Sequence, residues 1–327
     1  MASLADPHHL PFGAIWEIYE QLNDWVQYVT IGKFEQRASP GGHFVVDLAG
    51  DGRPVPLATF KAEGSQDRHR LIDASALGGL IEELLERLNA GQSPGSGIRL
   101  SPFFAKSVIA HVLRAWGLPP KRSAPREPRR GTLSLTCGLG GAYYFVNGER
   151  EFARPRTDEE EDEMQAGMRE STPPGNYVAD EWELVDEGPS GFAVIKTERP
   201  RYSVRVGDLV GIGESSGSKR TWSLGIIRWM MVRQGKGYRI GVQIISRSAS
   251  AVAVRAVSGS EQDRRYRRAL LFTHADDPGR RCMITDRGLF LGERVLELKE
   301  GDVERRVACG ALAESAVGFD YFTLSPG

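Results

Sequence analysis

The segment WELVDEGPSGFAVIK, residues 182–196, has the pattern of two short β-strands joined by a tight turn. The first strand is expected to end at Asp186, the turn to occupy residues 187–191, and the second strand to start at Phe192. A carboxylate at such a turn can accept N–H donors from a guanine base. Taken alone, however, the segment predicts no more than an ordinary hairpin.

Further short strands surround this hairpin. The stretch WSLGIIRWMMVRQGKGYRIGVQIIS, residues 222–246, predicts two strands around a QGKG turn, with Gly225 and Gly241 placed where a small barrel bends. Short strands separated by glycine-rich turns favour an antiparallel barrel over a βαβ arrangement. The expected strands are 132–137, 141–146, 180–186, 191–197, 206–213, 222–233 and 238–246.

A basic segment precedes the first of these strands. Residues 119–131, PPKRSAPREPRRG, hold Arg122 and Arg126 four residues apart among prolines, so the segment is expected to be extended rather than helical. Arginines on an extended arm suit a phosphorylated ligand, because guanidinium offers bidentate donors to phosphate and a flat face to a base. A solvated interdomain linker is the alternative interpretation.

The chain is predicted to divide into three domains and to have an α+β fold. Residues 1–118 form a mixed helix and strand module, and residues 119–256 form the β-barrel, with the basic arm at 119–130. An acidic run within residues 156–176 has little to bury and is expected to be an exposed loop of the barrel. Residues 257–327 return to strand-like segments and form a second, small all-β domain.

Three amphipathic helices are expected in the N-terminal module. The third is framed by Ser101 as a cap, Pro102 in the first turn and Gly117 just past the end. The apolar positions at helical spacing are Ile15, Tyr19, Leu22 and Val26, then Ala76, Leu80, Leu84 and Leu88, and then Phe104, Val108, Val112 and Ala115.

Composition narrows the class of protein. The 327 residues include no apolar run long enough to span a bilayer, and the first residues lack the pattern of a secretory signal, so we expect a soluble, cytoplasmic protein. The three cysteines and six histidines show no metal-ligand spacing, so no metal site is predicted. Without a catalytic motif either, the sequence predicts a protein that is not an enzyme.

In this order, the arm, the hairpin turn and the later pair of strands resemble the PilZ domain, whose usual role is to sense cyclic di-GMP. The resemblance covers residues 119–250. The family's Arg-x-x-x-Arg arm clasps the phosphates and guanine faces, and its Asp/Asn-x-Ser-x-x-Gly turn hydrogen-bonds a guanine. The resemblance therefore implies Arg122 and Arg126 as the clamp and Asp186 as the base reader. The other implied ligand contacts are Gly188, Ser190 and Gly191, with Lys121 and Arg130 as secondary contacts.

Three departures from the family pattern are visible. Gly188 stands where the family has serine, although Ser190 could substitute, and one lost hydrogen bond costs about 1 kcal/mol. Arg126 and Arg130 satisfy the arm spacing as well as Arg122 and Arg126 do. The arm and the turn are also about sixty residues apart, and the acidic loop accounts for the excess, since loop-closure entropy grows only slowly with length.

The leading functional hypothesis is a regulatory protein in which cyclic di-GMP binds at the arm and turn and changes a domain arrangement or the binding of an unknown protein partner. The alternative is a PilZ-like scaffold that has lost nucleotide binding and serves as a protein-interaction module. Nucleic acid is disfavoured as a partner because the net charge is −1 and no basic stripe is present. No cofactor and no membrane partner are predicted.

Overall fold

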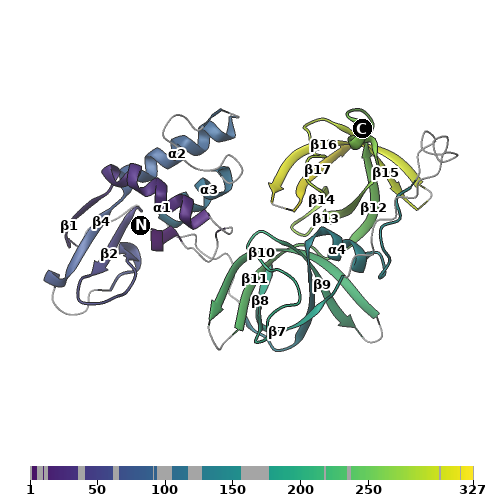
Figure 1. Cartoon of the computed structure of the whole chain (residues 1–327). Helices are drawn as coiled ribbons and strands as arrows, with labels where there is room; N and C mark the ends of the chain where they lie inside the picture. Colours follow the sequence, from purple (N-terminus) through teal and green to yellow (C-terminus); the bar gives the residue numbers. More distant parts are fainter. Residues whose placement is uncertain are drawn as a thin grey trace. The chain divides into compact units, whose positions relative to one another are not determined.

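The computed structural model describes most of the chain as two compact units, residues 1–123 and 124–327, each of which is treated by itself (Figure 1). The residues described are 2–5, 10, 14–35, 41–61, 66–90, 92–93, 105–116, 127–155, 177–216, 219–233, 237–301, 303–316 and 318–326.

The first unit combines helices with a small antiparallel sheet, whose strand order is β1-β4-β2-β3. The three predicted helices are present, but Tyr19 and Val26 of the apolar stripe expected on the first are exposed, and its buried face carries Ile18 and Trp25 instead. Ser101, Pro102 and Gly117 lie outside the described residues. One apolar core joins the helices and the sheet. In this core the rings of Trp25 and Trp116 pack edge to face, with their centres 6.1 Å apart. The elements are η1 (Ala2–Ala5), α1 (Ala14–Trp25), η3 (Val26–Tyr28), β1 (Thr30–Lys33), β2 (His43–Asp47), β3 (Val55–Pro56), η4 (Leu57–Thr59), η5 (Gln66–Arg68), β4 (His69–Asp73), α2 (Ser75–Asn89) and α3 (Ala105–Trp116).

The second unit begins with the predicted antiparallel barrel. Six strands close in the ring order β6-β7-β8-β11-β10-β9, and the two-residue strand β5 is added to the side of β7. Its interior is filled by apolar side chains that alternate along the strands, such as Val194, Ile240 and Val242. The strands are β5 (Glu127–Pro128), β6 (Thr132–Cys137), β7 (Asp180–Gly188), β8 (Gly191–Lys196), β9 (Leu209–Ser216), β10 (Lys219–Arg233) and β11 (Gly237–Ser246).

One predicted strand is wrong. Residues 141–146 belong to the helix α4 (Gly138–Val146), not to a strand. Tyrosine, phenylalanine and valine favour strands on propensity alone, but tertiary packing overrides that preference here. Gly141 packs tightly on the Thr136 side chain, where a Cβ would overlap the hydroxyl group, so the glycine lets the helix lie close to β6.

The chain then forms a second closed barrel with the same connectivity as the first. Its ring order is β12-β13-β14-β17-β16-β15, which is the order of the first ring with six added to each strand number. A one-turn helix, α6 (Glu261–Arg264), follows the first strand of this ring, as α4 follows β6. The strands are β12 (Ala249–Ala256), β13 (Arg267–His274), β14 (Asp277–Thr285), β15 (Val295–Glu300), β16 (Val303–Ser315) and β17 (Asp320–Pro326).

One sequence expectation changes with this ring. Residues 249–256 pair with β13 and β15, so they belong to the second barrel and not to the first, where the domain boundary at 256 had placed them. The repeat is one of connectivity, which the sequence pattern did not reveal. The division into three domains itself stays a prediction, and the acidic loop at 156–176 lies outside the described residues.

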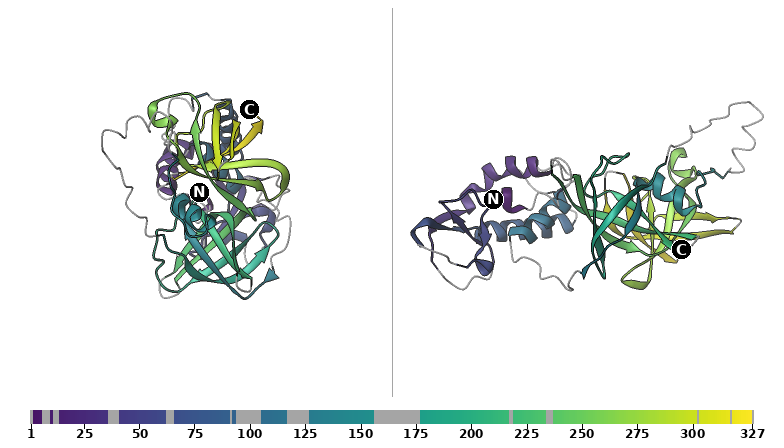
Figure 2. Two further views of the ribbon diagram at one scale, coloured as in Figure 1. Left: turned by 90° about the vertical axis from the view of Figure 1, so that its right-hand side faces the viewer. Right: turned by 90° about the horizontal axis from the view of Figure 1, so that it is seen from below.

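The two barrels share a core in which α4 takes part (Figures 1 and 2). Leu139 and Tyr143 of α4 pack in one apolar cluster with Leu224 of β10 and with Leu270 and Phe272 of β13. The interior of the second barrel is a separate cluster. Because neighbouring residues along β13 alternate between the shared core and that interior, the outer face of this strand is the one that meets α4.

A half-buried carboxylate, Asp208, stands at the start of β9. It accepts a hydrogen bond from the backbone N–H of Arg205 at 2.7 Å, yet burial raises the pKa of Asp208 to about 6. The folded protein therefore binds a proton more tightly than the unfolded chain at this group. Protonation of Asp208 therefore stabilises the folded protein. This contribution to the free energy of unfolding grows as the pH falls from about 6 toward 3.8, the pKa in the unfolded chain, and it is lost above pH 6.

Asp208→Asn keeps an acceptor for the Arg205 N–H and removes the buried charge. We expect the variant to be more stable than the parent at pH 8 by about 1–3 kcal/mol, with the difference shrinking toward pH 4. Urea unfolding at several pH values measures it. A difference that does not vary with pH would show that ionisation of Asp208 is not its cause.

Candidate functional site

The predicted hairpin is formed by β7 and β8. Gly188 pairs with Gly191, so only Pro189 and Ser190 lie in the loop between the strands. The pairing of β7 with β8 has an irregularity between Leu184 and Asp186. Such a bulge re-aims the side chains that follow it, and it decides which residues share a face with Asp186.

The described end of the basic arm runs beside this hairpin. β5 pairs with β7 so that Glu127 lies opposite Glu187 and Pro128 lies opposite Asp186. The next residue, Arg129, donates its backbone N–H to the Val185 carbonyl at 3.2 Å, and its guanidinium forms an ion pair with Glu187. Residues 127–129 are thereby fixed to the strand that carries the turn.

The structure describes only some of the arm residues that were predicted to contact the ligand. Lys121, Arg122 and Arg126 lie outside the described residues, and Arg130 is exposed. The arginine that the structure ties to the turn strand is Arg129, which the sequence analysis did not single out. Residues 127–128 pair with residues 58 to 60 positions later in the chain, so no local sequence signal could have identified Arg129.

Asp186 lies in a row of residues that crosses four strands. It pairs with Ala193 of β8, which pairs with Gly241 of β11, which pairs with Trp229 of β10. Paired residues in adjacent antiparallel strands point to the same face of the sheet. Since the neighbours of these residues along β8 and β11 fill the barrel interior, the row from Asp186 to Trp229 lies on the outer face.

Two functional candidates on this face were missed by the sequence analysis. Arg239 of β11 reaches Asp186, with its Nη2 atom 3.5 Å from the carboxylate Oδ2. The same guanidinium lies 5.8 Å from the centre of the Trp229 ring. Trp229 lies directly over Gly241, where any Cβ would overlap the indole. Strand register, which is absent from the sequence pattern, brings these residues together.

Gly191 has a structural reason to be glycine. A Cβ at this position would overlap the carbonyl oxygen of Val242 and crowd the Gln243 backbone. β8 therefore approaches β11 more closely here than a side chain would allow. Ser190 is exposed, and its carbonyl oxygen accepts the Ile244 N–H at 3.0 Å, so the loop is held against β11 while its hydroxyl remains open to solvent.

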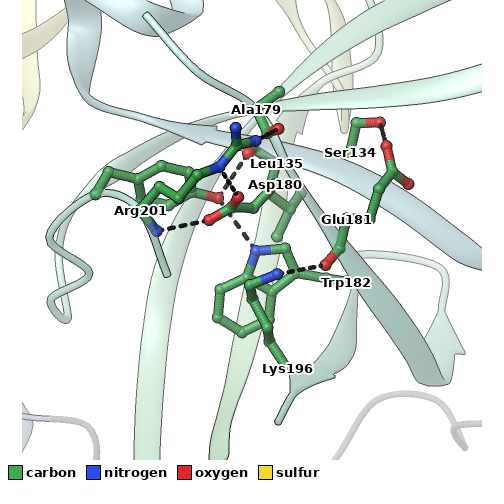
Figure 3. Close-up of polar contacts among 9 residues, drawn as sticks. Ser134, Leu135, Ala179, Asp180, Glu181, Trp182, Lys196 and Arg201 are labelled. Atoms are coloured by element: carbon green, nitrogen blue, oxygen red, sulfur yellow. Dashed lines mark hydrogen bonds and ion pairs between the residues drawn. The ribbon is translucent and has the colours of Figure 1, made fainter. Parts of the chain in front are cut away.

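The start of β7 is anchored by a polar network (Figure 3). Asp180, almost fully buried, accepts the backbone N–H of Arg201 at 2.8 Å and its side-chain Nε–H at 2.5 Å. The indole of Trp182 donates to Tyr202, whose hydroxyl donates to the Leu135 carbonyl at 2.6 Å. Burial raises the pKa of Tyr202 and keeps this donor protonated. The strand that carries Asp186 is therefore rigidly placed.

The outer face also contacts the second barrel. Gln243, opposite Gly191, accepts a hydrogen bond from Arg228 Nε at 2.7 Å. The two terminal nitrogens of Arg228 each donate to Glu314 of β16 at 2.8 Å. A bidentate arginine–carboxylate pair of this kind fixes orientation as well as distance. The hairpin is thus joined to the second barrel through two side chains of the first.

Within the part of the chain that the structure describes, no group of three or more His, Cys, Asp or Glu residues could hold a metal ion. No helix of the described residues is long and apolar enough to cross a membrane. The arrangement instead offers a carboxylate, a guanidinium and an aromatic ring side by side on a barrel surface. Such groups can hydrogen-bond and stack on a flat polar ligand.

A family model and a known relative both match this chain. A family model described as "Cyclic-di-GMP receptor FimW, middle PilZ domain" matches residues 43–180 and 156–251, and the two matches together span more than half of the chain. The cyclic-di-GMP receptor FimW of Pseudomonas aeruginosa strain PAO1 is 24% identical over 309 residues. The alignment covers 79% of this chain and 49% of FimW, so the chain spans about half the length of that relative.

Gly191→Ala tests the close approach of β8 and β11. We expect it to lower the free energy of unfolding by about 1–3 kcal/mol, because the backbone of β11 must move to admit the methyl group. Gly131→Ala, where nothing lies within 4 Å of the added Cβ, is the matched control. Urea unfolding compares the two, and equal stability of the variants would contradict the account of Gly191.

Proposed function

Because the chain belongs to the family of the FimW middle PilZ domain, we propose that it is a regulatory protein that binds cyclic di-GMP at the hairpin and the basic arm. Asp186 accepts N–H groups of a guanine, and Arg122 and Arg126 hold the phosphates. Gly188, Ser190 and Gly191 form the turn beside the base, with Lys121 and Arg130 as secondary contacts. The protein works by binding, and no catalytic step is involved.

The pairing of β5 with β7 is the observation that best supports this proposal. It places Glu127 opposite Glu187, next to Asp186, and Arg126 directly precedes Glu127 in the chain. An extended chain spans at most about 3.6 Å per residue, so Arg122 can lie no farther than about 18 Å from Glu127. Both arginines are therefore tethered within reach of a dinucleotide at the hairpin.

The chemistry of the ligand matches the two parts of the site. A cyclic dinucleotide carries two phosphate charges, which guanidinium groups bind through paired, charge-assisted hydrogen bonds. A carboxylate beside the phosphates would repel them, but Asp186 faces the outer surface near Arg239 and Trp229, where a base and not a phosphate is expected. The arm and the hairpin thus divide the recognition of phosphate and base between them.

The position of the arm also suggests how binding is transmitted. The segment between Trp116, at the end of α3, and Glu127, in β5, connects the first unit to the second. A ligand that holds Arg122 and Arg126 restricts this connection, and it thereby shifts the populations of the arrangements that the two units can adopt. A protein partner that binds one of these arrangements more tightly would then bind in response to the ligand.

Arg122→Ala combined with Arg126→Ala should weaken cyclic di-GMP binding about 100-fold or more, because each arginine loses a charge-assisted contact to phosphate. Isothermal titration calorimetry measures this, with folding checked by thermal unfolding. The matched control is Arg154→Ala combined with Arg199→Ala, which removes two exposed arginines outside the arm and hairpin. Binding unchanged in the arm variant, or lost equally in the control, would rule out the clamp.

A second candidate function is a PilZ-like scaffold that binds proteins and no nucleotide. Gly188 favours it, since the hydroxyl that the family pattern has at this position is missing, and Ser190 lies two residues away at the tip of the loop. A folded protein whose melting temperature does not rise with cyclic di-GMP would favour this alternative, because a ligand that binds only the folded state must raise it.

Gly188→Ser should restore the missing hydroxyl group. Among the described glycines, Gly188 is not one with positive φ, so a side chain is compatible with its backbone. One added hydrogen bond of about 1 kcal/mol corresponds to roughly fivefold tighter binding of cyclic di-GMP. Titration calorimetry compares Gly188→Ser with Gly188→Ala, and equal affinities would mean that the hydroxyl does not reach the ligand.

A further inference from the structure

Arg239 and Trp229 lie outside both the arm and the turn, yet they share the outer face with Asp186. We propose that Arg239 and Asp186 together form a guanine reader, in which Asp186 accepts the N1–H and N2–H groups of a base and Arg239 donates to its O6 and N7 atoms. Trp229 holds the guanidinium in place. This inference rests on the proposed function, and it names the residues that make the site specific for guanine.

Strand register places the three residues. Arg239 pairs with Ile195 of β8 and with Met231 of β10, two residues along each strand from the row that joins Asp186 to Trp229. Residues two apart along a strand point to the same face, so Arg239 and Gly241 face outward together. Arg239 is therefore the diagonal neighbour of Trp229, at a distance that long side chains bridge.

The row between Asp186 and Trp229 is built from small, buried residues. Ala193 and Gly241 occupy the two positions of the row between them. Trp229 lies across Gly241 because that position has no side chain. The row is covered and not open, because Ala193 and Gly241 are both buried and the indole of Trp229 lies over Gly241. A flat base would therefore meet the exposed parts of Asp186, Arg239 and Trp229 that lie above this row.

Arg239 is held loosely in a position suited to a ligand. Its guanidinium lies 3.5 Å from Asp186, longer than a strong ion pair, and its side chain is 44% exposed against 21% for Asp186. Contact with the Trp229 ring limits the directions that the guanidinium can take, because a cation is attracted to the ring face. The guanidinium of Arg239 can therefore turn toward a base while it keeps its contact with the Trp229 ring.

The pair has the donor and acceptor order that guanine requires. In guanine the O6 acceptor and the N1–H donor are adjacent, with N7 beside O6 and the N2 amine beside N1. A reader must present a donor next to an acceptor, as Arg239 Nη2 and Asp186 Oδ2 do. Adenine has an amine in place of O6 and lacks the N2 amine, so it would set a donor against Arg239. Cyclic di-AMP should therefore bind more weakly.

The test is titration calorimetry of the full chain with cyclic di-GMP and with cyclic di-AMP. The parent should bind cyclic di-GMP more tightly than cyclic di-AMP. In Arg239→Gln the ratio of the two affinities should fall by about 5- to 150-fold, since a bidentate contact to a base contributes discrimination of that size. Arg239→Lys, which keeps the charge but not the planar fork, should retain only part of it. Arg220→Gln, the same kind of change on the neighbouring strand β10 and away from Asp186, is the control and should leave the preference intact.

The outcomes separate this inference from the proposed function. If the parent binds cyclic di-GMP and Arg239→Gln keeps the full preference, the reader is wrong and the nucleotide site stands. If the folded parent binds neither dinucleotide, the proposed function fails and the reader fails with it. Trp229→Phe gives an independent readout: cyclic di-GMP should change the tryptophan fluorescence of the parent, and most of that change should be lost in the variant.

Discussion

The burial of α4 between two barrels is the constraint on which the second unit depends. The helix is apolar on most of its surface, so water must be excluded from more than one side of it, and a single barrel cannot do this. Strands of both rings contribute to the cluster around Leu139 and Tyr143. The arginine–carboxylate pair between Arg228 and Glu314 adds orientation to this apolar contact.

Given that packing, the position of the candidate site follows. The first barrel contacts α4 through residues of β9, β10 and β11, such as Leu209, Leu224 and Ile245, whereas Asp186 on β7 stays partly exposed. β7 is fixed at its start by Asp180 and Arg201. The part of the candidate site around Asp186 is therefore built on rigid strands, which hold functional groups more accurately than loops do.

Strand alternation and turn chemistry predicted the α+β fold, the barrel and the hairpin at Asp186, and the family predicted from the arm and turn is confirmed. The strand expected at 141–146 was wrong because a helix buried on several sides has no amphipathic period to distinguish it from a strand. Arg239 and Trp229 could not be predicted, because bulges in β7 and β10 set the register that joins them to Asp186. The clamp of Arg122 and Arg126 stays a prediction.

The matching connectivity of the two rings does not give them matching outer surfaces. In the first ring, the outer face of the second and third strands, β7 and β8, carries Asp186 and Ala193. In the second ring the corresponding strands are β13 and β14, and their outer residues, among them Phe272 and Ile284, are buried in the shared core. Packing between the two barrels therefore covers the outer face of β13 and β14. The repeated fold therefore has unequal surfaces: Asp186 stays partly exposed on the first ring, whereas Phe272 and Ile284 on the corresponding strands of the second ring are buried.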